Sequence, residues 1–83
     1  MWYIYIIECS DKTLYTGITN NLEKRIKTHN EGKGAKYTKT RLPVVLMTYF
    51  EAENKSIACK EEYRIKQLTR KQKLELINEQ DKG

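Results

Sequence analysis

The first part of the chain carries short apolar runs separated by polar turns. The run Trp2–Glu8 is aromatic and β-branched, almost continuously apolar, and too short for a helix. That composition is typical of a central strand that is covered on both faces. Turn residues occupy positions 10–13, and Leu14–Thr19 has the character of a second strand. The pattern therefore predicts a β-hairpin at residues 2–19.

A helical pattern follows the hairpin. Asn20 and Glu23 form a capping-box pair, so a helix is predicted to begin at Asn20. Its inward positions recur at helical spacing and are Leu22, Ile26 and His29. Gly32 is placed to end this helix, because glycine is the usual residue just past a helix C-terminus.

The remaining elements complete a β-β-α-β-α-α order. They are a loop over Glu31–Pro43 that is mobile or ordered by a ligand, a strand over Val44–Phe50, a helix from about Lys55 to Leu68 capped by Asn54 or Ser56, and a helix from a Thr69/Gln72 capping box to about Glu79 with Leu74 and Ile77 on one side. Adjacent hairpin strands argue against a parallel sheet. We expect an α+β fold with a three-stranded mixed or antiparallel sheet flanked by helices. It forms a single domain over residues 1–83, with its core at about 2–79.

The charge of the chain points to a polyanionic partner. Sixteen Lys and Arg residues against eleven Asp and Glu give a formal net charge of +5. The basic residues gather in two blocks, Lys24–Arg41 and Lys60–Lys73. Solvated helix faces explain either block alone about as well, whereas the two together favour a nucleic-acid surface. The chain has neither an apolar run of membrane-spanning length nor a secretory signal pattern, and we expect a cytoplasmic protein without membrane contact.

Three groups of side chains are candidates for chemistry. Arg25 and His29 are four residues apart, so they share one helix face, and the arginine projects either to water or into a cleft. On the second helix Glu61 falls inside the apolar stripe and Glu62 lies about 40° outside it, where a carboxylate needs either an ion pair or a metal. Six tyrosines are present, and a register with an even residue sum puts Tyr5 and Tyr15 on one sheet face.

Taken in order along the chain, these residues resemble a known family. The set comprises Tyr3-Ile4-Tyr5, then Tyr15-Thr16-Gly17, then Arg25, His29 and a helical Glu62. It is similar to the GIY-YIG nuclease superfamily, and above all to the small stand-alone bacterial members. Tyr3 stands where the name-giving motif has glycine, and Thr16 stands in place of its isoleucine.

The resemblance implies phosphodiester hydrolysis assisted by one Mg²⁺ or Mn²⁺ ion. Glu62 matches the carboxylate that ligates the metal. Tyr5 and Tyr15 match the tyrosines that orient the attacking water and the scissile phosphate, one of them as a possible general base. Arg25 matches the arginine that faces the phosphate, and His29 matches a position that assists proton transfer or phosphate binding.

The same resemblance sets the expected partners. DNA is the first expectation and RNA stays open, with backbone contacts expected from Lys24, Lys33, Lys36, Lys39, Arg41 and Lys66. The chain leaves no room for a separate targeting domain, so we expect a DNA endonuclease with low sequence preference that is a monomer or weak dimer. The alternative is a nucleic-acid-binding module of the same fold with weak or no catalysis.

Overall fold

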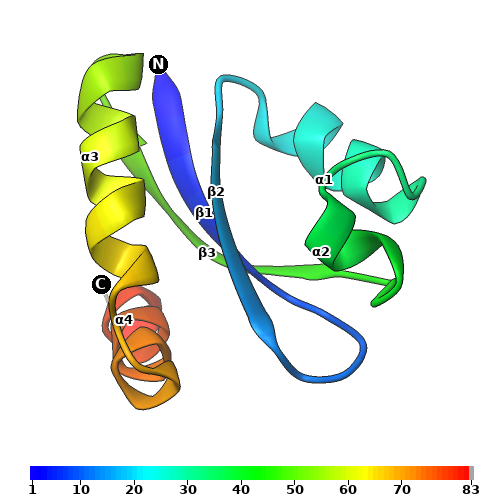
Figure 1. Cartoon of the computed structure of the whole chain (residues 1–83). Helices are drawn as coiled ribbons and strands as arrows, with labels where there is room; N and C mark the ends of the chain where they lie inside the picture. The colour runs from blue at the N-terminus through cyan, green and yellow to red at the C-terminus, as the bar shows by residue number, and fades with distance from the viewer. Residues whose placement is uncertain (83) are drawn as a thin grey trace.

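The computed structural model describes the backbone of residues 1–82 and the side chains of residues 1–80. The elements in chain order are β1 (Trp2–Glu8), β2 (Leu14–Thr19), α1 (Leu22–Asn30), α2 (Lys36–Lys39), β3 (Val45–Ala52), α3 (Lys55–Lys66) and α4 (Arg70–Lys82). The fold is α+β, as predicted, and the sheet lies between two pairs of helices (Figure 1). The short helix α2 lies inside the segment for which the sequence predicted only a loop.

The three strands form an antiparallel sheet in the order β2-β1-β3, so β1 is central as predicted. In the hairpin Tyr5 pairs with Gly17, and Ile7 pairs with Tyr15. Because side chains alternate between the faces of a strand, this even register places Tyr5 and Tyr15 on the same face.

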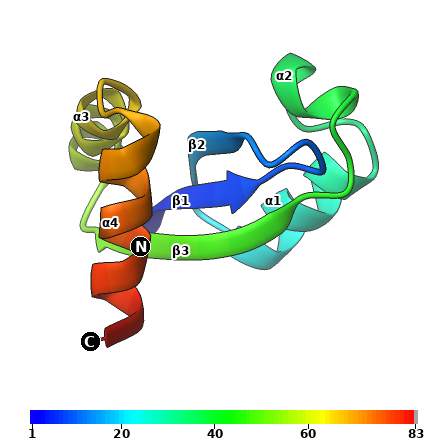
Figure 2. The same cartoon turned by 90° about the horizontal axis from the view of Figure 1, so that it is seen from below.

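The two faces of the sheet are covered by different helices (Figures 1 and 2). On one face α3 and α4 pack against a cluster of aliphatic side chains, whose buried members are Ile4, Ile6, Ala52, Ala58, Ile65 and Ile77. On the other face, under α1 and α2, the buried cluster is Tyr5, Ile7, Cys9 and Val44. We call these the α3/α4 face and the α1/α2 face.

The ends of two elements differ from the prediction for local reasons. Helix α1 begins at Leu22 because the cap is Asn21, not Asn20: the Asn21 side chain accepts a hydrogen bond from the Lys24 amide at 3.1 Å. The positive φ of 78° at Gly32 agrees with its predicted place after the helix. The third strand, predicted over Val44–Phe50, runs over Val45–Ala52. It begins at Val45 because the Asn30 side chain binds both backbone polar groups of Val44, and it extends to Ala52 because its pairing with β1 continues to Trp2.

The two C-terminal helices follow the prediction more closely. Asn54 caps α3 through the Ile57 amide at 2.9 Å, although α3 ends at Lys66 rather than Leu68. Thr69 and Gln72 form the predicted reciprocal capping box, and α4 runs beyond Glu79. Ile57 is 41% exposed, because the face of α3 that packs on the sheet is centred on Ala58 and Ile65. In the described part of the chain, no helix has both the length and the apolar character needed to cross a membrane.

Candidate active site

Tyr5 reaches the site by passing over a glycine on the neighbouring strand. Its side chain is buried, and its ring lies directly against Gly17 of β2. A Cβ atom at position 17 would lie 2.6 Å from Tyr5 Cζ and would overlap the hydroxyl. Any larger residue there would displace the ring. Glycine at this position therefore lets the Tyr5 hydroxyl extend across β2 toward α1.

A chain of hydrogen bonds begins at the Tyr5 hydroxyl. It lies 2.8 Å from His29 Nε2, and His29 Nδ1 lies 2.9 Å from Thr38 Oγ1. Thr38 Oγ1 also lies 3.0 Å from the Ala35 carbonyl, which only accepts. The Thr38 proton is therefore directed to Ala35, so Thr38 accepts from His29 Nδ1–H. The partners assign His29 as the Nδ1–H tautomer, with Nε2 accepting the Tyr5 proton.

The environment keeps the tyrosine and the histidine uncharged. Burial, with the nearby positive charge of Arg25, lowers the pKa of His29 below its ordinary value. Burial raises the pKa of Tyr5, although a hydrogen bond and the charge of Arg25 oppose that change. At neutral pH the pair is a phenol and a neutral imidazole.

Arg25 supplies the cation of the site. It projects from α1, and its Nε donates to the Tyr5 hydroxyl at 3.4 Å, while Nη2 donates to the Gly34 carbonyl at 3.5 Å. A cavity of about 220 Å³ adjoins it. The lining residues come from the end of β2 and the start of α1 and are Thr19, Asn20, Asn21, Lys24, Arg25 and Thr28.

Tyr15 connects the cluster of Tyr5, His29 and Arg25 to helix α3. Its ring meets His29 edge-on at a centroid distance of 5.7 Å and stacks with Tyr37 at 5.9 Å. The Lys66 ammonium lies 5.6 Å from the centroid of the same ring. Lys66 in turn pairs with Glu62 at 3.5 Å, one helical turn away. Glu62 thus joins the tyrosine cluster through Lys66.

The two glutamates on α3 have different surroundings. The Glu61 side chain is 43% exposed and pairs with Arg64 at 2.8 Å. The Glu62 side chain is only 24% exposed, and its charge contributes to the raised pKa of Tyr5. Glu62, rather than Glu61, is the carboxylate whose field reaches the cluster.

The predicted backbone-binding residues occupy four kinds of position. Lys24 lines the cavity beside Arg25, and Lys33, Lys36 and Lys39 are exposed along the segment that contains α2. Lys66 is paired with Glu62. Arg41 is engaged within the protein, with its Nε 3.0 Å from Asp11 Oδ2 and its Nη1 2.7 Å from the Tyr37 carbonyl.

Sequence reasoning missed three residues of the site. Thr38 is fully buried and fixes the His29 tautomer, and Tyr37 stacks on Tyr15. Gly34 lies flat against the His29 ring, where a Cβ would come within 2.6 Å of Cγ. The sequence does show a glycine, an aromatic residue and a threonine within one basic segment. Their spacing, however, does not predict that this segment folds back against α1.

The chain is similar to several known proteins. The chain matches the family model of the GIY-YIG catalytic domain over residues 1–75. A UPF0213 protein of Clostridium perfringens is 60% identical over 78 residues, which cover 94% of this chain and 84% of the relative. A UPF0213 protein of Staphylococcus haemolyticus is 57% identical over 77 residues, which cover 93% of this chain and 94% of the relative.

Two solved structures share the fold. The solution NMR structure of a UPF0213 protein from Bacillus halodurans matches with a TM-score of 0.60 and 43% identity, and the match covers 94% of this chain and 84% of that one. A solution NMR structure of a protein from E. faecalis matches with a TM-score of 0.62 and 40% identity, over 92% and 81% of the two chains.

Proposed function

Because this chain belongs to the GIY-YIG family of nuclease domains, we propose that it is a metal-dependent endonuclease that hydrolyses phosphodiester bonds in DNA with low sequence preference. The observation that supports this most strongly is the hydrogen-bonded chain from Arg25 through Tyr5 to His29. A cation, a phenol and a neutral imidazole in contact are suited to a reaction that neutralises a phosphate and moves a proton.

In the proposed reaction Tyr5 and His29 act together as the base. A water molecule beside the Tyr5 hydroxyl attacks phosphorus, and a new P–O bond forms as the sugar oxygen leaves with its electron pair. The water gives a proton to Tyr5 Oη, which passes its own proton to His29 Nε2. A tyrosine with a reference pKa of about 10 is neutral at pH 7, so it can take the proton of water only while it gives up its own, and the neutral imidazole of His29 is the group that accepts it.

Arg25 is proposed to hold the phosphate. Its guanidinium donates to the Tyr5 hydroxyl and adjoins the cavity that Lys24 also lines. A planar cation beside the attacking group stabilises the negative charge that develops on the non-bridging oxygens. The cavity is the proposed seat of that phosphate.

Glu62 is the proposed metal ligand, and its surroundings fit a hydrated hard cation. Within the described residues no three His, Cys, Asp or Glu side chains lie close enough together to hold an ion, so no such set of protein ligands surrounds Glu62. Mg²⁺ commonly keeps several waters and uses one or two carboxylates together with substrate phosphate. When bound, the ion supplies positive charge at the leaving oxygen. Lys66 then has to give up its 3.5 Å pairing with Glu62.

The Glu62–Lys66 pair also favours a second candidate function. A lysine that neutralises the carboxylate removes the repulsion between Glu62 and a phosphate without any metal. A module of this fold that binds nucleic acid without cleaving it is therefore the alternative. Under either function the exposed Lys33, Lys36 and Lys39 are proposed to contact the backbone, and RNA is a possible ligand as well as DNA.

A nuclease assay with matched variants separates these functions. Wild-type protein is incubated with duplex, single-stranded and branched DNA in Mg²⁺, in Mn²⁺ and in EDTA, beside Glu62→Gln and Arg25→Ala. The control is Glu61→Gln. It also removes one negative charge, but from the neighbouring carboxylate, which is paired with Arg64. The proposal predicts metal-dependent cleavage by wild type and by the control, and none by the other two variants. Binding without cleavage under every metal condition would instead establish the alternative.

A further inference from the structure

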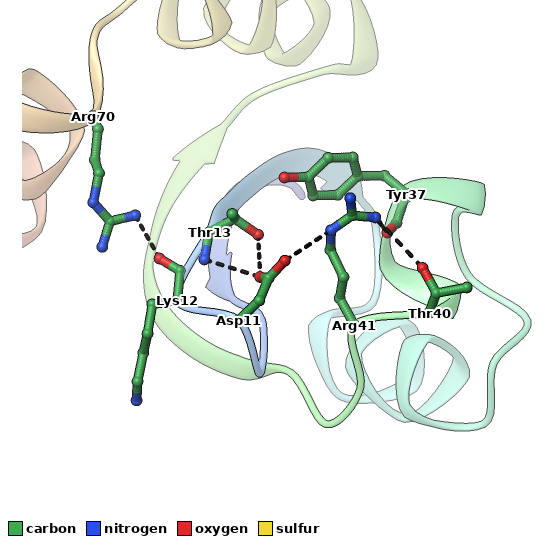
Figure 3. A network of polar contacts seen from close by, with 7 residues as sticks. All are labelled: Asp11, Lys12, Thr13, Tyr37, Thr40, Arg41 and Arg70. Carbon is green, nitrogen blue, oxygen red and sulfur yellow. Dashed lines mark hydrogen bonds and ion pairs between the residues drawn. The ribbon is translucent and has the colours of Figure 1, made fainter.

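The turn between β1 and β2 contains Asp11, whose two carboxylate oxygens accept hydrogen bonds from different parts of the chain. Asp11 Oδ1 accepts from the Thr13 amide at 3.1 Å and from the Thr13 hydroxyl at 2.6 Å, which fixes the side chain within its own turn. Asp11 Oδ2 accepts from Arg41 Nε at 3.0 Å, thirty residues further along the chain (Figure 3). Asp11 therefore has one oxygen for the turn and one for a distant segment.

Arg41 carries this link on to α2. Its Nη1 donates to the Tyr37 carbonyl at 2.7 Å, and its guanidinium carbon lies 4.1 Å from the centre of the Tyr37 ring. Figure 3 shows the guanidinium between the Asp11 carboxylate and Tyr37. The Arg41 carbonyl also accepts from the Ser10 amide at 2.9 Å. The hairpin turn thus holds the end of the α2 segment at two points.

Helix α2 needs such an outside anchor because it has little stability of its own. It has four residues, and no side chain caps its first residue. Yet its two middle residues meet the cluster described above: Tyr37 stacks on Tyr15, and Thr38 accepts from His29. The placement of both residues depends on what holds α2 against the sheet.

We propose that Asp11 is a positioning residue for the reaction. Through Arg41 it holds α2 so that Thr38 fixes the His29 tautomer and Tyr37 supports Tyr15. The part of this proposal that concerns turnover rests on the proposed nuclease function. Asp11 also neutralises Arg41, so its loss leaves a free cation beside the basic α2 segment. Removing the charge of Asp11 therefore slows turnover without weakening the binding of nucleic acid.

The test compares Asp11→Asn with Glu8→Gln. Glu8 flanks the same hairpin turn and pairs with Lys12 at 3.7 Å, so Glu8→Gln removes an equal charge without touching Arg41. We expect Asp11→Asn to lower kcat about 2- to 5-fold, the range of an exposed ion pair, with an unchanged or tighter Kd for DNA. Glu8→Gln keeps wild-type kcat, and Arg41→Lys, which keeps the charge but loses the fork, resembles Asp11→Asn.

A second measurement is independent of turnover. The ¹⁵N chemical shifts of the His29 imidazole report its tautomer, and we expect Asp11→Asn to introduce some Nε2–H form while Glu8→Gln does not. Equal kcat for Asp11→Asn and Glu8→Gln overturns the proposal, as does a lower kcat with weaker DNA binding and an unchanged His29 spectrum. If wild type cleaves nothing, the nuclease function fails and the His29 spectra alone decide whether Asp11 positions the histidine.

Discussion

The two faces of the sheet are built on different principles. Under α3 and α4 the buried cluster is aliphatic, with Ile4, Ile6 and Ile65 at its centre. Under α1 and α2 the sheet instead buries Tyr5, and His29 and Thr38 are fully buried beside it. Aliphatic packing stabilises the fold in proportion to the area it buries, whereas burying a polar group costs free energy unless the group is hydrogen-bonded. The comparison indicates that one face mainly holds the chain together and the other mainly holds hydrogen-bonded polar groups in place.

Tyr5→Phe is expected to have the largest effect, and on activity. It keeps the ring that covers Gly17 but removes the hydroxyl that bonds to His29. Loss of a general acid–base group commonly costs about 10²- to 10⁴-fold, so kcat for DNA cleavage should fall by that factor. The control on the opposite face is Ile6→Val, which should keep its kcat. Cleavage by Tyr5→Phe at the wild-type rate would remove Tyr5 from the reaction.

Ile65→Ala is expected to have the opposite profile. Ile65 is 1% exposed in the aliphatic cluster, and truncating such a side chain costs about 2–5 kcal/mol of unfolding free energy. Urea unfolding followed by circular dichroism measures that loss. Cleavage per folded molecule should stay at the wild-type value at a temperature where the variant is folded. A fall in kcat of the folded variant would mean that the two faces are not separable.

The two glycines after α1 provide a smaller and sharper contrast. Gly34→Ala places a methyl group against the His29 ring, so it should cost about 1–3 kcal/mol and also lower kcat. A Cβ atom at Gly32 would meet Leu42 Cδ1 at an ordinary contact distance of 3.8 Å, but φ at this position is 78°. Gly32→Ala should therefore cost about 1–2 kcal/mol of backbone strain with little change in kcat. Denaturant midpoints and kcat, measured for both variants, test this. If both variants lose activity in proportion to stability, His29 is not sensitive to its neighbour.

The smallest expected effect is a dependence of stability on pH. Burial and the charge of Arg25 lower the pKa of His29 in the native protein, whereas a histidine in the unfolded chain has a pKa of about 6.5. Between these two pKa values the unfolded chain binds a proton that the native chain does not. The contribution of the neutral His29 to the unfolding free energy is therefore fully present above a pH of about 6.5. It is lost as the pH falls from there through the lowered pKa of the native histidine. Urea titrations of wild type and His29→Gln across this range should show the His29 contribution in wild type alone. Parallel curves would contradict the burial argument.

Much of the fold was predictable because it depends on local patterns. The strands Trp2–Glu8 and Leu14–Thr19, the Asn54 cap and the Thr69/Gln72 capping box each follow from residues close together in sequence. The placement of Tyr5 and Tyr15 on one face needed only the parity of the hairpin register.

The missing parts depend on contacts between distant residues. Helix α2 has no cap of its own and is held by Arg41 and Thr38, so no local pattern predicts it. Arg41 was expected to face nucleic acid because its sequence neighbours are basic. Its contact with Asp11 was not predicted, because Asp11 lies thirty positions away in the sequence. Metal binding by Glu62 and DNA binding by the lysines stay predictions, since each is tested only with the metal ion or the DNA itself.

The ¹⁵N spectrum of the His29 imidazole in the wild-type protein examines the α1/α2 face most directly. The hydrogen bonds to Tyr5 and Thr38 require a neutral ring at pH 7 with its proton on Nδ1 and a free electron pair on Nε2. We therefore expect a protonated-type shift at Nδ1 and an unprotonated shift at Nε2, with a coupling through the Tyr5 hydrogen bond. A proton on Nε2, or an imidazolium at pH 7, would contradict the proposed transfer of the Tyr5 proton to His29.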